Sequence, residues 1–124
     1  MDKIYTSQAP EAIGPYSQAT VAGNLIFTSG QIPIDPATGQ VEAESIHEQT
    51  EQVMKNLCAV LEAAGSGLAS AVKPTCLLSD MEDFTAFNEV YARYFTEKPA
   101  RSCVAVKTLP KNVKVEVEVI AVRS

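Results

Sequence analysis

The most constraining feature of this chain is the alternation of residues 113–122, VKVEVEVIAV, in which a valine stands at every second position from 113 to 119. Side chains along a β-strand point alternately to its two faces, so the four valines share one face. That apolar face must cover a hydrophobic core, which predicts a strand in a sheet with one buried face. Glu116 and Glu118 then project from the opposite face.

A second strand-like run, residues 99–106, begins with Pro-Ala-Arg and carries Arg101 and Cys103 on the face opposite its valines. We expect it to pair with the first run as a hairpin, through a turn at residues 108–112. The valine faces of the two strands then coincide. Arg101 and Cys103 would therefore lie on the same non-core face as Glu116 and Glu118.

This grouping of charges indicates a site for a small acid. A guanidinium binds a carboxylate through two parallel hydrogen bonds, and a neighbouring glutamate can carry a proton. The same sequence also fits a solvated ion pair across two antiparallel strands, which is a common surface feature. Other motifs must decide between the two interpretations.

The length of 124 residues predicts one domain, residues 1–124, and the hydrophobic content of 46% is ordinary for a globular protein. No apolar run approaches the ~20 residues of a membrane span. The first residues lack the pattern of a signal peptide, so a cytoplasmic location is expected. The net charge of −5 argues against a general nucleic-acid binder, because phosphate contacts need basic patches.

Cysteine and histidine usage argues against several other site types. The three cysteines, Cys58, Cys76 and Cys103, match neither a disulfide framework nor a zinc-ligand pattern, so reduced thiols and no metal site are expected. The single histidine, His47, is predicted to lie exposed in the first turn of a helix. A lone histidine argues against a nuclease that uses a histidine pair.

The order of patterns along the chain predicts an α+β fold. A short strand at 4–5 precedes a hairpin of residues 16–21 and 25–29, and residues 31–44 read as a loop. A helix begins at the Ser45-x-x-Glu48 capping box and ends at Gly65. Residues 71–78 form a strand that Pro74 places at an edge or bulge, and Asp80 caps a second helix. The expected domain is a mixed, mostly antiparallel sheet with two helices on one face.

The other face of this sheet also needs a cover. It carries apolar residues among polar ones, which favours burial against another copy of the protein. These residues are Leu25, Phe27, Ile120 and Val122.

Residues in three further segments are candidates for a site, each with a structural alternative. Tyr16 follows a Gly-Pro turn and either faces a ligand or covers a sheet edge. Ser29 and Gly30 end a strand, where a glycine lets the backbone approach a ligand but also suits a simple turn. Asn88, at the margin of an apolar helix face, either is satisfied locally or faces a partner surface.

Together these segments resemble the RidA/YjgF-type Rid family, of the chorismate-mutase-like fold, over essentially the whole chain. The resemblance rests on GPY at 14–16, TSGQIP at 28–33, NEVY at 88–91, PARSC at 99–103 and KVEVE at 114–118. It implies a homotrimer with a central barrel of sheets, helices outside and clefts between subunits. It further implies hydrolysis of 2-imino acids (2-iminobutanoate, 2-iminopropanoate) to 2-keto acids and ammonia, with no cofactor.

The resemblance also implies roles for individual residues. Arg101 would grip the substrate carboxylate and Glu116 would position water and relay protons, as the catalytic pair. The residues lining the cleft would be Tyr16, Ser29, Asn88 and Cys103. Glu118, two residues from Glu116 on the same face, is interpreted as an interface charge.

Two alternatives to a deaminase remain open. The chain fits a non-catalytic trimer that binds metabolites and regulates, or an endoribonuclease and translation inhibitor, which the acidic charge and lone His47 disfavour. Many relatives carry extra residues before Pro99, whereas here the second helix runs almost directly into Pro-Ala-Arg. This shorter loop puts substrate preference in doubt more than activity.

Overall fold

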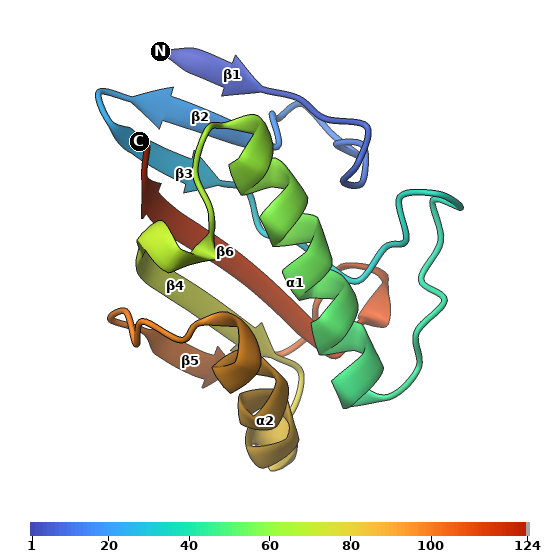
Figure 1. Ribbon diagram of the computed structural model, residues 1–124. Coiled ribbons are helices and arrows are strands. Elements are labelled where there is room, and N and C mark those ends of the chain that lie inside the picture. The colour runs from blue at the N-terminus through green and yellow to red at the C-terminus, as the bar shows by residue number, and fades with distance from the viewer. Residues whose placement is uncertain (124) are drawn as a thin grey trace.

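The computed structural model describes residues 1–123 and contains one sheet of six strands in the order β1-β2-β3-β6-β4-β5 (Figure 1). Strands β4 and β5 are parallel and every other pair is antiparallel, which confirms the mixed, mostly antiparallel sheet. The strands are β1 (Asp2–Ile4), β2 (Ala19–Ala22), β3 (Leu25–Thr28), β4 (Ala71–Leu78), β5 (Ser102–Ala105) and β6 (Val115–Val122).

Both helices, α1 (Ile46–Ala63) and α2 (Phe84–Tyr94), cover the same face of this sheet (Figure 1). The core lies between them and the sheet. It contains the valines of β6 at 115, 117 and 119, all almost fully buried, as their alternation predicts. Short 3₁₀ turns at Leu68–Ser70, Met81–Asp83 and Pro110–Asn112 complete the elements. The α+β architecture expected from the sequence is therefore confirmed.

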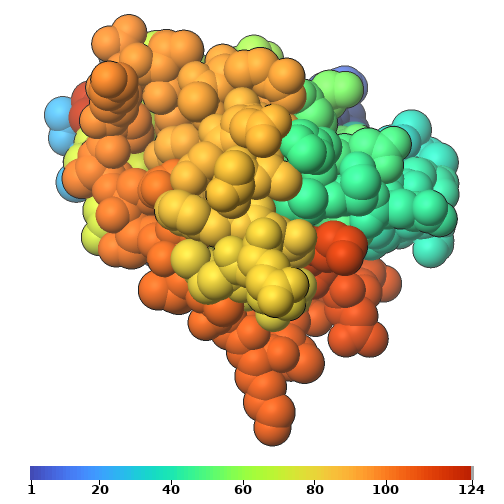
Figure 2. All heavy atoms as spheres, turned by 90° about the horizontal axis from the view of Figure 1, so that it is seen from below, coloured from blue at the N-terminus to red at the C-terminus, as the bar shows by residue number. Residues whose placement is uncertain are grey.

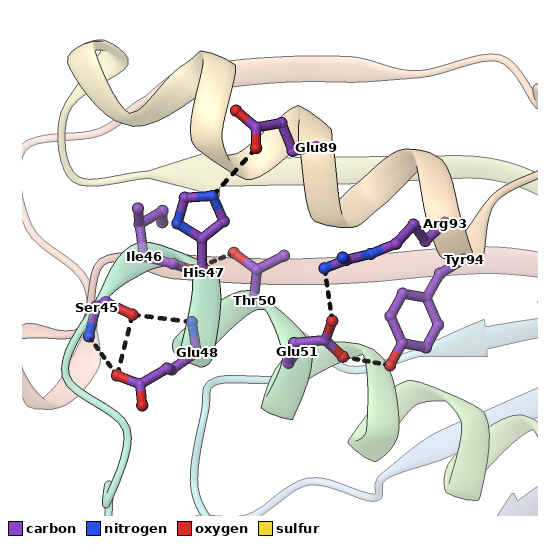
Figure 3. A network of polar contacts seen from close by, with 9 residues as sticks. All are labelled: Ser45, Ile46, His47, Glu48, Thr50, Glu51, Glu89, Arg93 and Tyr94. Carbon is purple, nitrogen blue, oxygen red and sulfur yellow. Dashed lines mark hydrogen bonds and ion pairs between the residues drawn. The ribbon is translucent and has the colours of Figure 1, made fainter.

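The ends of α1 follow their sequence signals. The Ser45 hydroxyl accepts a hydrogen bond from the Glu48 backbone N–H, and the Glu48 carboxylate accepts one from the Ser45 backbone N–H, which completes the capping box (Figure 3). Gly65, just beyond the helix, has a φ of +81°, a conformation that favours glycine. Asp80 caps the short turn Met81–Asp83, and α2 begins after it.

Polar side chains join the outer surfaces of α1 and α2 (Figure 3). Arg93 donates to Glu51 over 2.8 Å, and the Tyr94 hydroxyl donates to the other oxygen of the same carboxylate. His47 is exposed in the first turn of α1, as expected, and its ring lies 3.4 Å from Glu89. Figure 2 shows α2 between the start of α1 and the orange segment that leads into β5.

The hairpin expected between residues 99–106 and 113–122 does not form. Strand β4 lies between β5 and β6, parallel to one and antiparallel to the other. The connection from β5 to β6 is too long for a tight hairpin turn, and it contains a 3₁₀ turn in which Lys111 and Asn112 adopt positive φ. The connection instead joins two strands that are separated by β4. Residues 75–78 of β4 pair with β5 on one side and with β6 on the other.

This pairing puts Arg101 and Glu116 on opposite faces of the sheet, which corrects the expected common face. Cys76 of β4 lies opposite both Val117 of β6 and Cys103 of β5, so all three side chains face the helices. Glu116 lies opposite Leu77 and faces away from them. The face of β5 was assigned wrongly because its valines were assumed to be buried, whereas Val104 is 51% exposed.

The face away from the helices, called here the open face, carries exposed apolar side chains among polar ones. Phe27 is 39% exposed and Val122 is 36% exposed, and both were predicted there, while Leu25 and Ile120 are partly covered.

Pro74 precedes the residues of β4 that pair with β5 and follows an irregularity between Ala71 and Lys73. Its expected place at an edge or bulge is thereby confirmed.

No helix in the described part of the chain is long and apolar enough to cross a bilayer.

Candidate functional site

A cavity of about 470 Å³ opens where β3 ends, beside the start of β6. Four segments form its walls: the loop before β2, the residues after β3, the 3₁₀ turn at Pro110 and the face of β6 that carries Glu116 and Glu118. We call the part of the cavity that comprises Tyr16, Ser29, Gly30, Glu116 and Glu118 the glutamate half. The structure thus brings together three of the residues singled out in the sequence: Tyr16, Ser29 and Glu116.

Two buried amides hold the walls of this cavity. Gln18 is 3% exposed, and its side chain accepts a hydrogen bond from the Thr6 N–H and donates to the carbonyls of Thr6 and Pro10, which anchors the loop before β2. Asn56 of α1 donates to the carbonyls of Ile32 and Ile34 over 3.1 and 2.9 Å. Because buried polar groups need partners, these bonds fix both loops firmly.

The hydroxyl groups of the glutamate half already have backbone partners. Ser29 Oγ donates to the Ser17 carbonyl over 2.6 Å, and the Tyr16 hydroxyl accepts from the Ile13 N–H over 3.2 Å. The Tyr16 oxygen keeps its own proton to donate, and Ser29 Oγ keeps lone pairs to accept. Both groups are therefore held in place while retaining capacity for a ligand.

Glu116 is half-buried in this cavity, and its carboxylate receives no hydrogen bond or ion pair from residues 1–123. Burial raises the pKa of this carboxyl above its ordinary value, and the charge of nearby Glu118 raises it further. A carboxyl without protein partners and with a raised pKa has the properties required of a proton carrier.

The arginine half lies on the helix-covered face and comprises Phe84, Asn88, Tyr91 and Arg101. The Arg101 guanidinium donates to Asn88 Oδ1 over 2.7 Å. Its central carbon lies 4.7 Å from the centre of the Tyr91 ring and 5.5 Å from that of Phe84. It has no carboxylate partner within the described residues, yet three side chains fix its orientation. Arg101 also lines a second, open cavity of about 350 Å³ at the end of α2.

Cys103 lies beside this half, close enough for Arg101 to affect its thiol. Burial raises the pKa of Cys103, and the positive charge of Arg101 opposes that shift. Cys76, across from it on β4, is fully buried, and burial raises its pKa to about 12. All three cysteines are free, and burial raises the pKa of each thiol, which indicates weak nucleophiles.

The sequence-predicted site residues therefore form two groups instead of one. Tyr16, Ser29 and Glu116 lie in the glutamate half, whereas Asn88, Arg101 and Cys103 lie across the sheet. Sequence reasoning missed the supporting residues Gln18 and Asn56, which appeared only as polar interruptions of apolar patterns. It also missed the rings of Phe84 and Tyr91 as partners of Arg101. Each of these residues lies about one helical turn from Asn88, on either side of it, which the sequence does show.

Within residues 1–123, no three histidine, cysteine, aspartate or glutamate side chains lie close enough together to bind a metal ion.

Comparison with known proteins identifies the family. Residues 6–123 match the family described as endoribonuclease L-PSP. A RutC family protein from Pyrococcus horikoshii is 56% identical over 119 residues, covering 95% of this chain and 94% of that protein. A 2-iminobutanoate/2-iminopropanoate deaminase from Salmonella typhimurium is 49% identical over 124 residues, covering 97% and 96%.

Solved structures agree with this result. The crystal structure of E. coli TdcF with bound serine is 44% identical, superposes with a TM-score of 0.94 and is matched over 100% of both chains. The match to a family over nearly all of the sequence, together with the same fold, is decisive. This chain belongs to the endoribonuclease L-PSP family, which includes the YjgF, RutC and Rid proteins.

Proposed function

We propose that this protein hydrolyses 2-imino acids, such as 2-iminobutanoate and 2-iminopropanoate, to 2-keto acids and ammonia. The observation that carries the proposal is the state of Arg101. Its guanidinium is held by Asn88, Tyr91 and Phe84 but is not neutralised by any carboxylate within residues 1–123. A fixed guanidinium with free donors is prepared for the carboxylate of a substrate.

The carboxyl of Glu116 supplies the second requirement. A protonated imine is already electrophilic, so water attacks its carbon as the water proton passes to the Glu116 carboxylate. Glu116 then returns this proton to the nitrogen. As the C–N bond breaks, the new hydroxyl gives its proton to the Glu116 carboxylate and becomes the carbonyl of the keto acid. The released ammonia takes up that proton as ammonium, which restores the carboxylate. The raised pKa of Glu116 brings its proton affinity closer to neutral pH, which suits these transfers. Tyr16 and Ser29 would hold the polar ends of the substrate, and the backbone at Cys103 would help to position the water.

The active unit would be a homotrimer, in which a cleft between subunits joins the two halves. Arg101 and Glu116 of one chain face opposite sides of its sheet, so a single copy does not present both to one small substrate. The open face carries exposed apolar side chains, among them Phe27, Val104 and Val122. Burying such a face against other copies is favourable, which supports assembly through it.

The first test is the release of keto acid and ammonia from 2-iminobutanoate that a dehydratase generates in the assay. We expect the wild type to accelerate the release and Arg101→Ala to lose most of the acceleration. The Arg93→Ala variant, which removes an exposed arginine of α2, serves as the matched control and should behave as wild type. No acceleration by a well-folded wild type would contradict a deaminase.

The shared site has its own test. The impaired Arg101→Ala and Glu116→Gln chains, mixed by unfolding and refolding together, should reach about a quarter of wild-type activity, above either variant alone, if each cleft takes one residue from each of two subunits. If both residues acted within one chain, mixing would restore nothing. Sedimentation of the wild type measures the trimer directly.

A metabolite-binding regulator is the alternative that the same geometry favours, because the arginine half alone is enough to bind a carboxylate. Isothermal titration with 2-ketobutanoate distinguishes the two functions when read beside the activity assay. Binding that depends on Arg101, without imine turnover, would assign the protein to binding. His47 lines neither cavity described above, and the structure offers no observation that favours a nuclease.

A further inference from the structure

Gly30 lies directly against the side chain of Glu116, where a Cβ atom would overlap the carboxyl group in its present position. A Cβ atom built on Gly30 would lie 2.1 Å from Glu116 Oε2, 2.8 Å from its Cδ and 3.0 Å from its Cγ. Non-bonded heavy atoms come into favourable contact at about 3.5–4.0 Å, so these distances are steric overlaps. The Glu116 carboxyl group therefore fills the space that any side chain at position 30 would take.

The backbone conformation does not explain this glycine. Gly23, Gly39 and Gly65 have positive φ, but Gly30 does not, so its φ angle is accessible to other residues. Gly30 instead leaves space for the neighbouring carboxylate, because all three atoms that a Cβ would meet belong to Glu116.

The backbone around Gly30 is fixed on both sides. The Ser29 N–H donates to the Gln18 carbonyl, and Gln31 exchanges two hydrogen bonds with Val117, over 2.9 and 3.2 Å. Val117 is the residue next to Glu116, so Gly30 and Glu116 are held in one frame by main-chain bonds. A side chain at position 30 would displace the end of the flexible glutamate rather than the backbone.

We propose that Gly30 is a positioning residue for Glu116. The space left by the missing side chain at position 30, called here the seat, determines where the Glu116 carboxylate lies. Glu116 has no hydrogen bond from other residues of the described chain, so the shape of this seat sets its position within the cavity. The inference rests on the proposed function for the catalytic meaning of that position, but its geometric part is independent of it.

The test is Gly30→Ala. The methyl group should push the carboxylate aside by about 1 Å or more while the fold and the thermal midpoint stay near those of the wild type. Displacements of this size cost up to about 100-fold in rate, so kcat for 2-iminobutanoate should fall by roughly that factor. KM should change little, because the arginine half is untouched. A merely structural role for Gly30 would lower the thermal midpoint and leave kcat of the folded protein unchanged.

Gly67→Ala is the matched control. Gly67 has an extended backbone, and a Cβ built on it meets no atom within 4 Å. This variant makes the same chemical change without a neighbour to displace. We expect wild-type kcat, and a loss equal to that of Gly30→Ala would overturn the proposal.

A double variant covers the case in which Gly30→Ala is unstable. Adding Glu116→Ala removes the overlapping atoms, so it should restore the thermal midpoint. If the thermal midpoint is not restored, the alanine clashes with atoms other than those of Glu116, and the proposed positioning role of Gly30 is wrong.

The outcomes separate this inference from the proposed function. Wild-type turnover that is lost in Glu116→Gln but kept in Gly30→Ala overturns the positioning role and leaves the deaminase standing. A wild type without turnover overturns the deaminase. In that case, crystal structures of the wild type and Gly30→Ala decide the geometric part, and a carboxylate that has not moved overturns it.

Discussion

The arginine half and the glutamate half hold their charged groups in opposite ways. Arg101 is fixed by side chains, through a hydrogen bond to Asn88 and contacts with two aromatic rings. Glu116 has no such partner and lies over the bare backbone of Gly30. The difference fits the roles proposed for the two residues. A binding group gains from being locked, whereas a group that exchanges protons needs its lone pairs free and its pKa near the working pH.

The largest effect on activity should come from removing Glu116, the proposed proton carrier. Glu116→Gln keeps the shape of the side chain but cannot accept a proton, so kcat should fall by about 10²- to 10⁴-fold. Steady-state kinetics on 2-iminobutanoate measures this. Glu97→Gln, on the exposed loop after α2, is the control for loss of one negative charge. A kcat within twofold of wild type would remove Glu116 from the mechanism.

Removing Arg101, the proposed carboxylate clamp, should have a smaller effect on the overall rate. Arg101→Ala loses charge-assisted hydrogen bonds worth about 1.5–3 kcal/mol, so kcat/KM should fall roughly 10- to 150-fold. Arg101→Lys should also perform poorly, because an ammonium replaces a planar fork. If the lysine variant turns over imines like the parent, a bidentate clamp is wrong.

Loosening the clamp without deleting it should cost less again. Asn88→Leu removes the oxygen that accepts a hydrogen bond from Arg101, so the guanidinium is held less firmly but keeps its own bonds to the substrate. We expect substrate binding to weaken by about 1 kcal/mol, which raises KM by about fivefold with little change in kcat. Titration with 2-ketobutanoate should show the same loss of affinity. An unchanged KM would mean that the aromatic rings alone orient the guanidinium.

The neighbouring charge tunes the glutamate half. Glu118 raises the pKa of Glu116, so Glu118→Gln should lower that pKa and move the acidic limb of the kcat/KM profile to lower pH. The maximum rate should hardly change. The pH profile of Glu62→Gln, remote from the cavity on α1, should overlay that of the wild type, and a Glu118→Gln profile that also overlays it would contradict the coupling.

The smallest effect should be on stability. The pKa of Glu116 is higher in the folded protein than in an unfolded chain, so its ionised form destabilises the fold. That penalty is absent below the unfolded pKa and complete above the folded one. Glu116→Gln should therefore raise the thermal midpoint at pH 7, and the gain should vanish near pH 4. A gain that is the same at both pH values would point to packing instead of charge.

Local signals in the sequence were reliable where one segment decided its own structure. The Ser45–Glu48 box predicted the start of α1 because the two residues that cap the helix are only three positions apart in the sequence. The valine alternation predicted the buried face of β6 because a strand's periodicity is local. The prediction of a second hairpin was wrong because strand pairing depends on contacts between distant segments. Nothing in the two strand sequences indicates that β4 lies between them.

The sequence by itself determined the α+β class, the two helices, the core face of β6 and the family. It also named Tyr16, Ser29, Asn88, Arg101 and Glu116 as candidates. Only the tertiary structure decided that Arg101 and Glu116 face opposite sides of the sheet and that Gly30 makes room for a carboxylate. The reason is physical: periodicity specifies two faces of each strand, but which faces coincide depends on the strands paired between them.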